Sequence, residues 1–183
     1  MKYNPGHFQP NVWQRITKII SSNRIGSAYL FSGPEGTGKE AAALAFSAAL
    51  NCQGNEIICG SCSSCVRFSS LQHEHLHVIV PLPRKKANFD KDTDVLSIIG
   101  DDNAALLTDL LQKKGTDPFQ KINIPRAKRI LINSIRELRK KLYLKSVDSG
   151  YKMVLIFDAH CLSDGDGASA NALLKLLEEP PKK

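Results

Sequence analysis

The chain of 183 residues has little of what marks a membrane or secreted protein. Its longest apolar runs, such as Met153 to Phe157, fall far below the roughly 18 residues that a membrane-spanning helix requires. The first residues, Met1 to Gly6, contain no apolar core of the kind that a signal peptide has. We therefore expect a cytoplasmic protein that has no membrane partner.

What the chain does have is the composition of a globular protein, with 42% hydrophobic and 23% charged residues. Lysine and arginine number 25 against 18 aspartates and glutamates, and the net charge of +7 favours a polyanionic partner. Five cysteines in a reducing compartment are more readily thiols or metal ligands than a disulfide scaffold.

Strand and helix patterns alternate along the chain, which predicts an α/β fold with a parallel sheet flanked by helices, in one domain over residues 1–183. Residues 82–124 differ in character and are interpreted as a surface insertion. Buried strands are expected at 27–32, 76–80 and 154–158, and helices at 12–20, 40–50, 105–115 and 168–177, with the longest helix opening at Pro125.

The run from Gly33 to Lys39 matches the phosphate-loop pattern G-x-x-x-x-G-K and lies between a predicted strand and a predicted helix. Glycines let the backbone N–H groups turn inward, and the helix N-terminus adds partial positive charge. A lysine at the end of the loop reaches the outer phosphates of a nucleotide. The predicted phosphate-binding residues are Gly33, Gly36, Thr37, Gly38 and Lys39.

Two positions depart from a hydrolysing site. The residue after Lys39 should carry a hydroxyl that ligates Mg²⁺, but it is Glu40, which can bind the metal yet would repel phosphates. Asp158 ends an apolar strand and can hold Mg²⁺ through water, but Ala159 stands where a glutamate would orient the attacking water. We expect weak or absent ATPase activity, and the sequence leaves binding of ATP with Mg²⁺ open.

Four of the five cysteines form the pattern C-x6-C-x2-C-x2-C over residues 52–65, namely Cys52, Cys59, Cys62 and Cys65. Thiolates two residues apart can turn back onto one ion, and four of them complete a closed tetrahedral zinc site. Gly60 supports the tight turn. We predict a structural zinc module; an iron–sulfur cluster or four free thiols are the alternatives. Cys161 is expected to be a small buried residue.

Two weaker ligand patterns are interpreted as structural. Alternate histidines occur at His73, His75 and His77, but no carboxylate or cysteine accompanies them on the strand face that they would share. Acidic residues at Asp90, Asp92, Asp94 and Asp101 imitate a calcium loop. In that loop, Val95 occupies the position that requires glycine.

Residues 121–145 carry nine basic side chains and one acidic one, Glu137. A helix this biased repels itself unless an anion is near, and phosphate contacts with nucleic acid would supply one. The alternative is a solvated helix face. The basic residues are Lys121, Arg126, Lys128, Arg129, Arg136, Arg139, Lys140, Lys141 and Lys145, of which Arg136, Arg139 and Lys140 are the predicted DNA contacts.

Together with the string Asn-Ala-Leu-Leu-Lys-Leu-Leu-Glu-Glu-Pro-Pro at 171–181, these motifs resemble the bacterial DNA polymerase III clamp-loader AAA+ family. The resemblance covers residues 10–80 and 126–181. It implies a P-loop NTPase fold of the AAA+, RecA-like type, with the cysteines as the family's zinc module. Six residues between Cys52 and Cys59 are fewer than motor subunits usually have.

Glu40 and Ala159 make the chain similar to the delta-prime subunit, which often loses parts of the ATPase machinery. The resemblance implies a stator in DNA replication that contacts delta and gamma/tau, helps load the sliding clamp and meets primed DNA weakly. The alternatives are a gamma/tau-like motor subunit that tolerates Glu40, a zinc-stabilised nucleic-acid-binding module with an inactive loop, and a P-loop kinase.

The resemblance also implies that the sensor strand, the arginine-finger motif, the lid and the collar lie beyond Pro181, so that the chain is an N-terminal fragment. The sensor strand would separate the strands at 27–32 and 153–158, leaving each with an unpaired edge. We expect residues outside this sequence, or another copy of the chain, to fill that gap.

Overall fold

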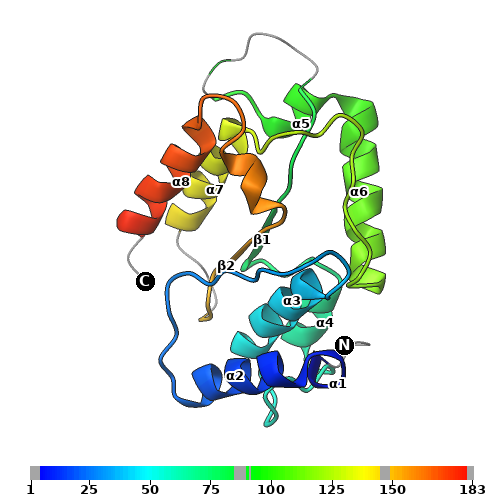
Figure 1. Cartoon of the computed structure of the whole chain (residues 1–183), viewed down its shortest axis with the longest axis vertical. Coiled ribbons are helices and arrows are strands. Elements are labelled where there is room, and N and C mark those ends of the chain that lie inside the picture. The colour runs from blue at the N-terminus through cyan, green and yellow to red at the C-terminus, as the bar shows by residue number, and fades with distance from the viewer. Residues whose placement is uncertain (1–4, 85–89, 91, 145–148, 181–183) are drawn as a thin grey trace. The chain divides into compact units, whose positions relative to one another are not determined.

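The computed structural model describes residues 5–84, 90, 92–144 and 149–180 (Figure 1). Two residues of the predicted motifs, Lys145 and Pro181, lie outside these ranges. In chain order the elements are α1 (Pro5–Phe8), α2 (Pro10–Ser21), α3 (Lys39–Leu50), α4 (Ser63–Ser69), β1 (Leu76–Ile79), α5 (Val95–Ile99), α6 (Asp101–Thr116), α7 (Ile132–Tyr143), β2 (Met153–Ile156), the 3₁₀ helix η1 (Ala159–Leu162) and α8 (Ala168–Glu178).

The chain divides into two compact units. The first comprises Met1–Leu76, Leu111–Lys121 and Gly150–Leu155, and the second comprises His77–Leu110, Ile122–Ser149 and Ile156–Lys183. Helix α6 and both strands therefore run from one unit into the other. The phosphate loop and the cysteines belong to the first unit, whereas Asp158 and the basic helix belong to the second.

The two strands form a parallel sheet of order β1-β2. The amide of Met153 donates to the carbonyl of His75 at 2.7 Å, and the amide of Phe157 donates to the carbonyl of Ile79 at 2.9 Å. Apolar residues of both strands are buried, including Leu76, Ile79 and Leu155. The prediction of a mixed α/β fold with parallel strands is confirmed for these two segments.

The remaining predicted strand, at residues 27–32, is not a strand in the structure. This segment has no regular structure, and Leu30 is 84% exposed. The rings of Tyr29 and Phe31 approach Phe46 of α3, with centroids 5.0 and 6.4 Å away. A strand exists only where a neighbour completes its hydrogen-bond ladder. Because β2 pairs with β1 instead, the apolar run lies extended and without a ladder.

The first unit is built around α3, whose residues Ala41 to Ala49 are all buried. Alanine has the highest helix propensity and lets neighbouring elements approach closely on every side. Trp13 of α2 packs against Ala41 and Ala45, and α4 lies beside α3 (Figure 1). The prediction that α3 is covered on more than one side is confirmed.

The basic helix begins later than the sequence predicted. Helix α7 starts at Ile132 rather than Pro125, because Arg126 takes a left-handed conformation with φ of 64° that interrupts a helix. The carbonyl of Arg129 then accepts the amide of Leu82 at 2.9 Å, and the amide of Ile130 donates to the carbonyl of Cys161. These long-range bonds occupy the backbone before the helix. The longest helix is α6, with 16 residues.

Residues 82–124 contain α5 and α6 and are more deeply packed than a surface segment. Ile98, Ile99 and Lys114 are 1%, 0% and 1% exposed. Each of these side chains contributes to the interior of its own unit. The status of the segment as an insertion stays a prediction.

Within the second unit, α7 and α8 lie side by side (Figure 1). Ser169 at the start of α8 donates its hydroxyl to the carbonyl of Ile130 at 2.7 Å, which ties α8 to the segment just before α7. Among the residues that the structure describes, no helix combines the length and the apolar character needed to cross a bilayer.

Candidate functional site

The phosphate loop has the backbone that its glycines allow. Gly36 and Gly38 have φ of 77° and 74°, in the left-handed region that glycine adopts without strain. Gly38 is the N-cap of α3, and its carbonyl accepts the amide of Ala42 at 2.9 Å, so the loop leads directly into the helix N-terminus. The local turn and helix predicted for this motif are present.

Polar side chains close the loop upon itself. The hydroxyl of Thr37 and the ammonium of Lys39 both donate to the carbonyl of Pro34, at 2.9 and 3.0 Å. Gln9 donates its side-chain amide to the carbonyl of Thr37 at 3.3 Å, which connects the loop to the residue before α2. Lys39 therefore lies back over the loop, and its contact with an anion stays a prediction.

Glu40, the residue in the metal-ligand position, forms an ion pair with Lys114 at 2.5 Å. The Lys114 side chain is fully buried, with 0% exposure, and that of Glu40 is 24% exposed. The same ammonium also donates to the carbonyls of Pro118 and Gln120, at 3.2 and 2.8 Å. Sequence reasoning missed Lys114, since it lies 74 positions from Glu40 in a segment without a motif.

A second acid of the loop is paired with the same segment. Glu35 accepts from the ammonium of Lys121 at 2.9 Å, in an exposed ion pair. This hydrogen bond, together with the charge of Lys121, lowers the pKa of Glu35 below its usual range. The stretch 111–121 thus compensates the negative charges of Glu35 and Glu40. The charge of Lys39 then makes the net charge at the loop positive.

Asp158, the predicted Mg²⁺ residue, adopts a left-handed conformation with φ of 50° directly after β2. Its carbonyl accepts the amide of Cys161 at 2.9 Å, which starts η1, and Ala159 is the first residue of that helix. The loop lies in the first unit and Asp158 in the second. A metal site formed by both stays a prediction.

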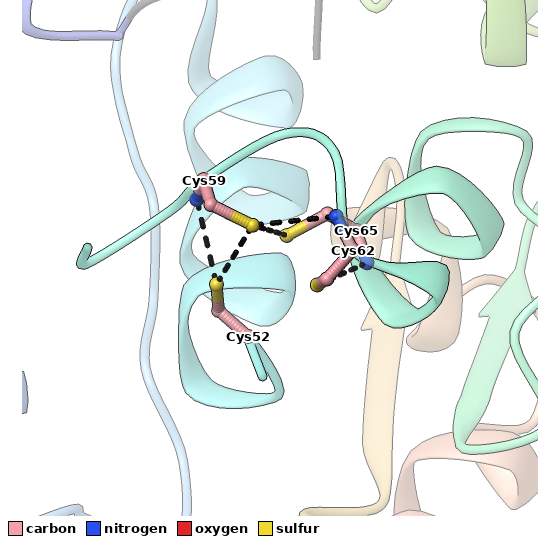
Figure 2. A group of neighbouring side chains, drawn as sticks. All are labelled: Cys52, Cys59, Cys62 and Cys65. Atoms are coloured by element: carbon pink, nitrogen blue, oxygen red, sulfur yellow. Dashed lines mark hydrogen bonds between the residues drawn. The ribbon is translucent and has the colours of Figure 1, made fainter. Parts of the chain in front are cut away.

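The four cysteines converge on one point (Figure 2). Their sulfur atoms all lie within 4.8 Å of one another. The Sγ of Cys59 is 3.6 Å from that of Cys52 and 4.0 Å from that of Cys65. Tetrahedral zinc with bonds of about 2.3 Å separates its sulfurs by about 3.8 Å. The four sulfurs are therefore grouped closely enough to surround one zinc ion, with the most widely spaced of them drawing together when it binds.

Backbone amides point at these sulfurs. The amide of Cys59 donates to the Sγ of Cys52, that of Cys62 to Cys59, and that of Cys65 to Cys62, each at 3.4 Å. The amides of Cys62 and Ser61 lower the pKa of Cys59 to about 6, which favours the thiolate that binds metal. Burial raises the pKa of Cys65, and a cation beside it would counter that effect.

A glycine that sequence reasoning overlooked shapes this module. A Cβ added to Gly54 would lie 2.8 Å from both the Cβ and the Sγ of Cys59. Gly60, which the sequence singled out, has φ of 71° and makes the predicted turn. The signal that sequence reasoning overlooked is a glycine only two positions after Cys52. A side chain at this position would have no room beside Cys59.

The weaker ligand patterns do not form metal sites among the described residues, where the cysteines are the one cluster of three or more ligands. His73 is buried, stacks on Phe68 at 4.1 Å and lies 3.0 Å from the hydroxyl of Ser64. Asp94 caps α5 by accepting the amides of Leu96 and Ser97. Cys161 is buried, as the sequence predicted.

The predicted DNA contacts lie along one side of α7. Arg139 and Lys140 are exposed and Arg136 is partly so, whereas Ile135 and Leu138 are buried on the opposite side. Lys140 forms an exposed ion pair with Asp92 at 2.6 Å, and the guanidinium of Arg139 lies 5.7 Å from the ring centroid of Tyr143. The arrangement presents a basic face, part of whose charge is already compensated.

Comparison with known proteins identifies the family from nearly the whole chain. The family described as DNA polymerase III, delta subunit, matches residues 8–183. The chain belongs to this family. The prediction of a bacterial clamp-loader family member is therefore confirmed.

Relatives of this family member include subunits with different names. The chain is 28% identical to the DNA polymerase III subunit gamma/tau of Mycobacterium bovis and 29% identical to subunit tau of Bacillus subtilis, over 99% and 98% of its length and 25% of each relative. It is 31% identical to subunit delta' of Bacillus subtilis, over 95% of its length and 39% of that relative. The chain spans well under half of these relatives, and the similar identities do not distinguish the subunit types.

Proposed function

We propose that this member of the family acts as a delta-prime-like stator of the replicative clamp loader, which helps place the sliding clamp on primed DNA without hydrolysing ATP itself. The observation that carries the proposal is the ion pair between Glu40 and buried Lys114. It occupies the position where a motor subunit holds a hydroxyl ligand for Mg²⁺. Ala159 supplies a second, independent defect, since it has no carboxylate to orient water.

The cysteine module has a structural role in this proposal. Its four sulfurs would fill every coordination position of one zinc ion, which leaves no open position for chemistry. Cys52 follows α3 and Cys62 caps α4, so a bound ion would fix the two helices against each other. The proposed cofactor is therefore structural zinc, whereas ATP with Mg²⁺ has no catalytic role.

The proposed partners are the delta and gamma/tau subunits, with the sliding clamp reached through the assembly and primed DNA contacted by α7. The DNA contact would be weak, because Lys140 is already paired with Asp92. Such a protein is a component of the DNA polymerase holoenzyme that lacks strong ATPase activity of its own.

A gamma/tau-like motor is the second candidate, and one observation favours it. The loop keeps the conformation of its glycines and places Lys39 over the turn, as a phosphate-binding loop requires. A zinc-stabilised nucleic-acid-binding module would share the cysteines and α7 but would not need the clamp-loader partners. A P-loop kinase is the least favoured candidate, because no motif in the sequence supplies a substrate pocket or a second catalytic carboxylate.

To distinguish a stator from a motor, the clamp loader is reconstituted with the full-length protein. ATP turnover and clamp loading are then measured. We expect omission of this subunit to abolish loading, whereas Lys39→Ala leaves both rates unchanged. A drop of about tenfold or more in turnover with Lys39→Ala would identify a motor. Loading that continues without the subunit would favour the nucleic-acid-binding module.

A further inference from the structure

The ammonium of Lys114 is committed in all of its hydrogen-bonding directions. It donates to Glu40, to the carbonyl of Pro118 and to that of Gln120, which are three acceptors for three N–H groups. Its side chain has no exposed surface. Burying an ammonium is costly unless a carboxylate compensates it, so Glu40 and Lys114 require each other.

This pairing does not fit the Mg²⁺ that phosphate loops of this type bind. Mg²⁺ demands near-ideal octahedral oxygen ligands and gives up its waters reluctantly. For Glu40 to become such a ligand, its carboxylate would have to leave Lys114 or share its oxygen between two cations. The first alternative leaves the buried Lys114 ammonium without a counter-ion. The second brings Mg²⁺ and that ammonium, which repel each other, to the same carboxylate.

We propose that the Lys114 ammonium takes the place of the metal ion at this loop, so that the Glu40–Lys114 pair excludes Mg²⁺ and the metal does not strengthen nucleotide binding. The inference rests on the proposed function for its premise that the loop does not hydrolyse ATP. It adds that Mg²⁺ is excluded by Lys114, a residue of α6 that lies outside the phosphate-loop motif. The ammonium of Lys114 is in effect the cation that Glu40 binds in place of a metal ion.

The test measures ATP binding to the full-length protein by titration calorimetry, with Mg²⁺ and with EDTA. For the unaltered protein we expect affinities that agree within about twofold, or binding in neither condition, because Mg²⁺ adds no contact. In the double variant Glu40→Thr, Lys114→Met, which restores the hydroxyl and removes the ammonium, Mg²⁺ should raise the affinity about tenfold or more. Two results would overturn the proposal. One is that the unaltered protein binds ATP more tightly with Mg²⁺ than with EDTA, and the other is that Mg²⁺ does not raise the ATP affinity of a folded double variant.

A matched control uses the exposed pair of the same loop and segment. Glu35→Gln with Lys121→Met removes two charges in the same way but leaves the metal-ligand position untouched, so it should gain no Mg²⁺ dependence. The melting temperature and the bound metal of each variant report whether it is folded.

A second measurement needs no variant. In protein labelled with ¹⁵N-lysine, a buried ammonium should give a resolved side-chain NMR signal that Mg²⁺ at millimolar concentration does not shift. Displacement of this signal by Mg²⁺ would contradict the exclusion even if the double variant fails to fold. These binding readouts are independent of clamp loading, so a failure of the stator proposal in the reconstituted assembly is distinguishable from a failure of this one.

Discussion

At the scale of single residues, two lysines of one segment show how burial changes the value of the same interaction. Lys114 and Lys121 each pair with a glutamate of the phosphate loop, but their side chains are 0% and 52% exposed. Water screens the exposed pair, whereas the buried ammonium has only its protein partners.

Neutralising the acid of each pair should therefore have very different effects. Glu40→Gln leaves a buried charge without a counter-ion and should lower the free energy of unfolding by about 3–5 kcal/mol. Glu35→Gln, the matched change in the exposed pair, should have a much smaller effect, because water already screens that pair. Urea denaturation of both variants checks the difference. Equal effects would mean that Lys114 reaches water.

Gly54 tests the geometry of the cysteine module at the same scale. Gly54→Ala would place a methyl group 2.8 Å from the Sγ of Cys59, and we expect zinc affinity to fall by about tenfold or more. Gly26→Ala is the control, because its added Cβ meets only the flexible end of Tyr29, at 3.3 Å. Competition with a chromogenic chelator measures both affinities. An unchanged affinity in Gly54→Ala would show that the loop can move away.

At the scale of elements, the C-terminus of α3 is joined to the start of β2 by one side chain. The Oδ1 of Asn51 accepts the amide of Tyr151 at 2.9 Å, and its Nδ2 donates to the carbonyl of Tyr151 at 3.2 Å. Gly150 leaves room for this amide, since a Cβ there would lie 2.7 Å from the Oδ1 of Asn51. A helix end and a strand 100 positions away are thereby aligned.

Asn51→Ala should remove both bonds and lower the free energy of unfolding by about 1–3 kcal/mol, because two hydrogen bonds to the backbone of Tyr151 are lost. Asn55→Ala, in the exposed loop of the same unit, should change it by less than about 0.5 kcal/mol. Thermal unfolding of the two variants supplies the comparison. Similar melting temperatures would contradict the role given to Asn51.

Periodicity and composition predicted α2, α3, α6, α8 and the two paired strands, since those signals depend on neighbours along the chain. They misjudged residues 27–32 and the start of α7. In the first case an apolar run lacks a partner strand, and in the second a left-handed Arg126 and a bridge to Leu82 replace the expected helical turn. Both outcomes depend on distant segments.

At the scale of the whole molecule, the net charge of +7 is not spread evenly, and α7 holds much of it in exposed side chains. Backbone phosphates attract such a face without regard to base sequence. Counter-ions released on binding make the affinity depend on salt.

Reversing Arg136, Arg139 and Lys140 to glutamate should lower DNA affinity about tenfold or more at low salt, equally for all sequences, and reduce its salt dependence. Reversing Arg15, Lys18 and Arg24, which are exposed in the first unit, changes the net charge equally and is the control. Fluorescence anisotropy with primed DNA of two sequences measures the effect. Equal losses in both variants would indicate general charge attraction instead of a contact at α7.

Residue types at short, regular spacing were sufficient to predict the phosphate-loop turn, the cysteine cluster and the family. Glycines at 36 and 38 adopt left-handed conformations wherever that loop forms, and cysteines two positions apart converge through local turns. Only the tertiary structure decided that Glu40 meets Lys114 and that α6 carries a residue of the loop's surroundings. Burial of an ion pair is a property of everything packed around it, and no spacing along the chain records it.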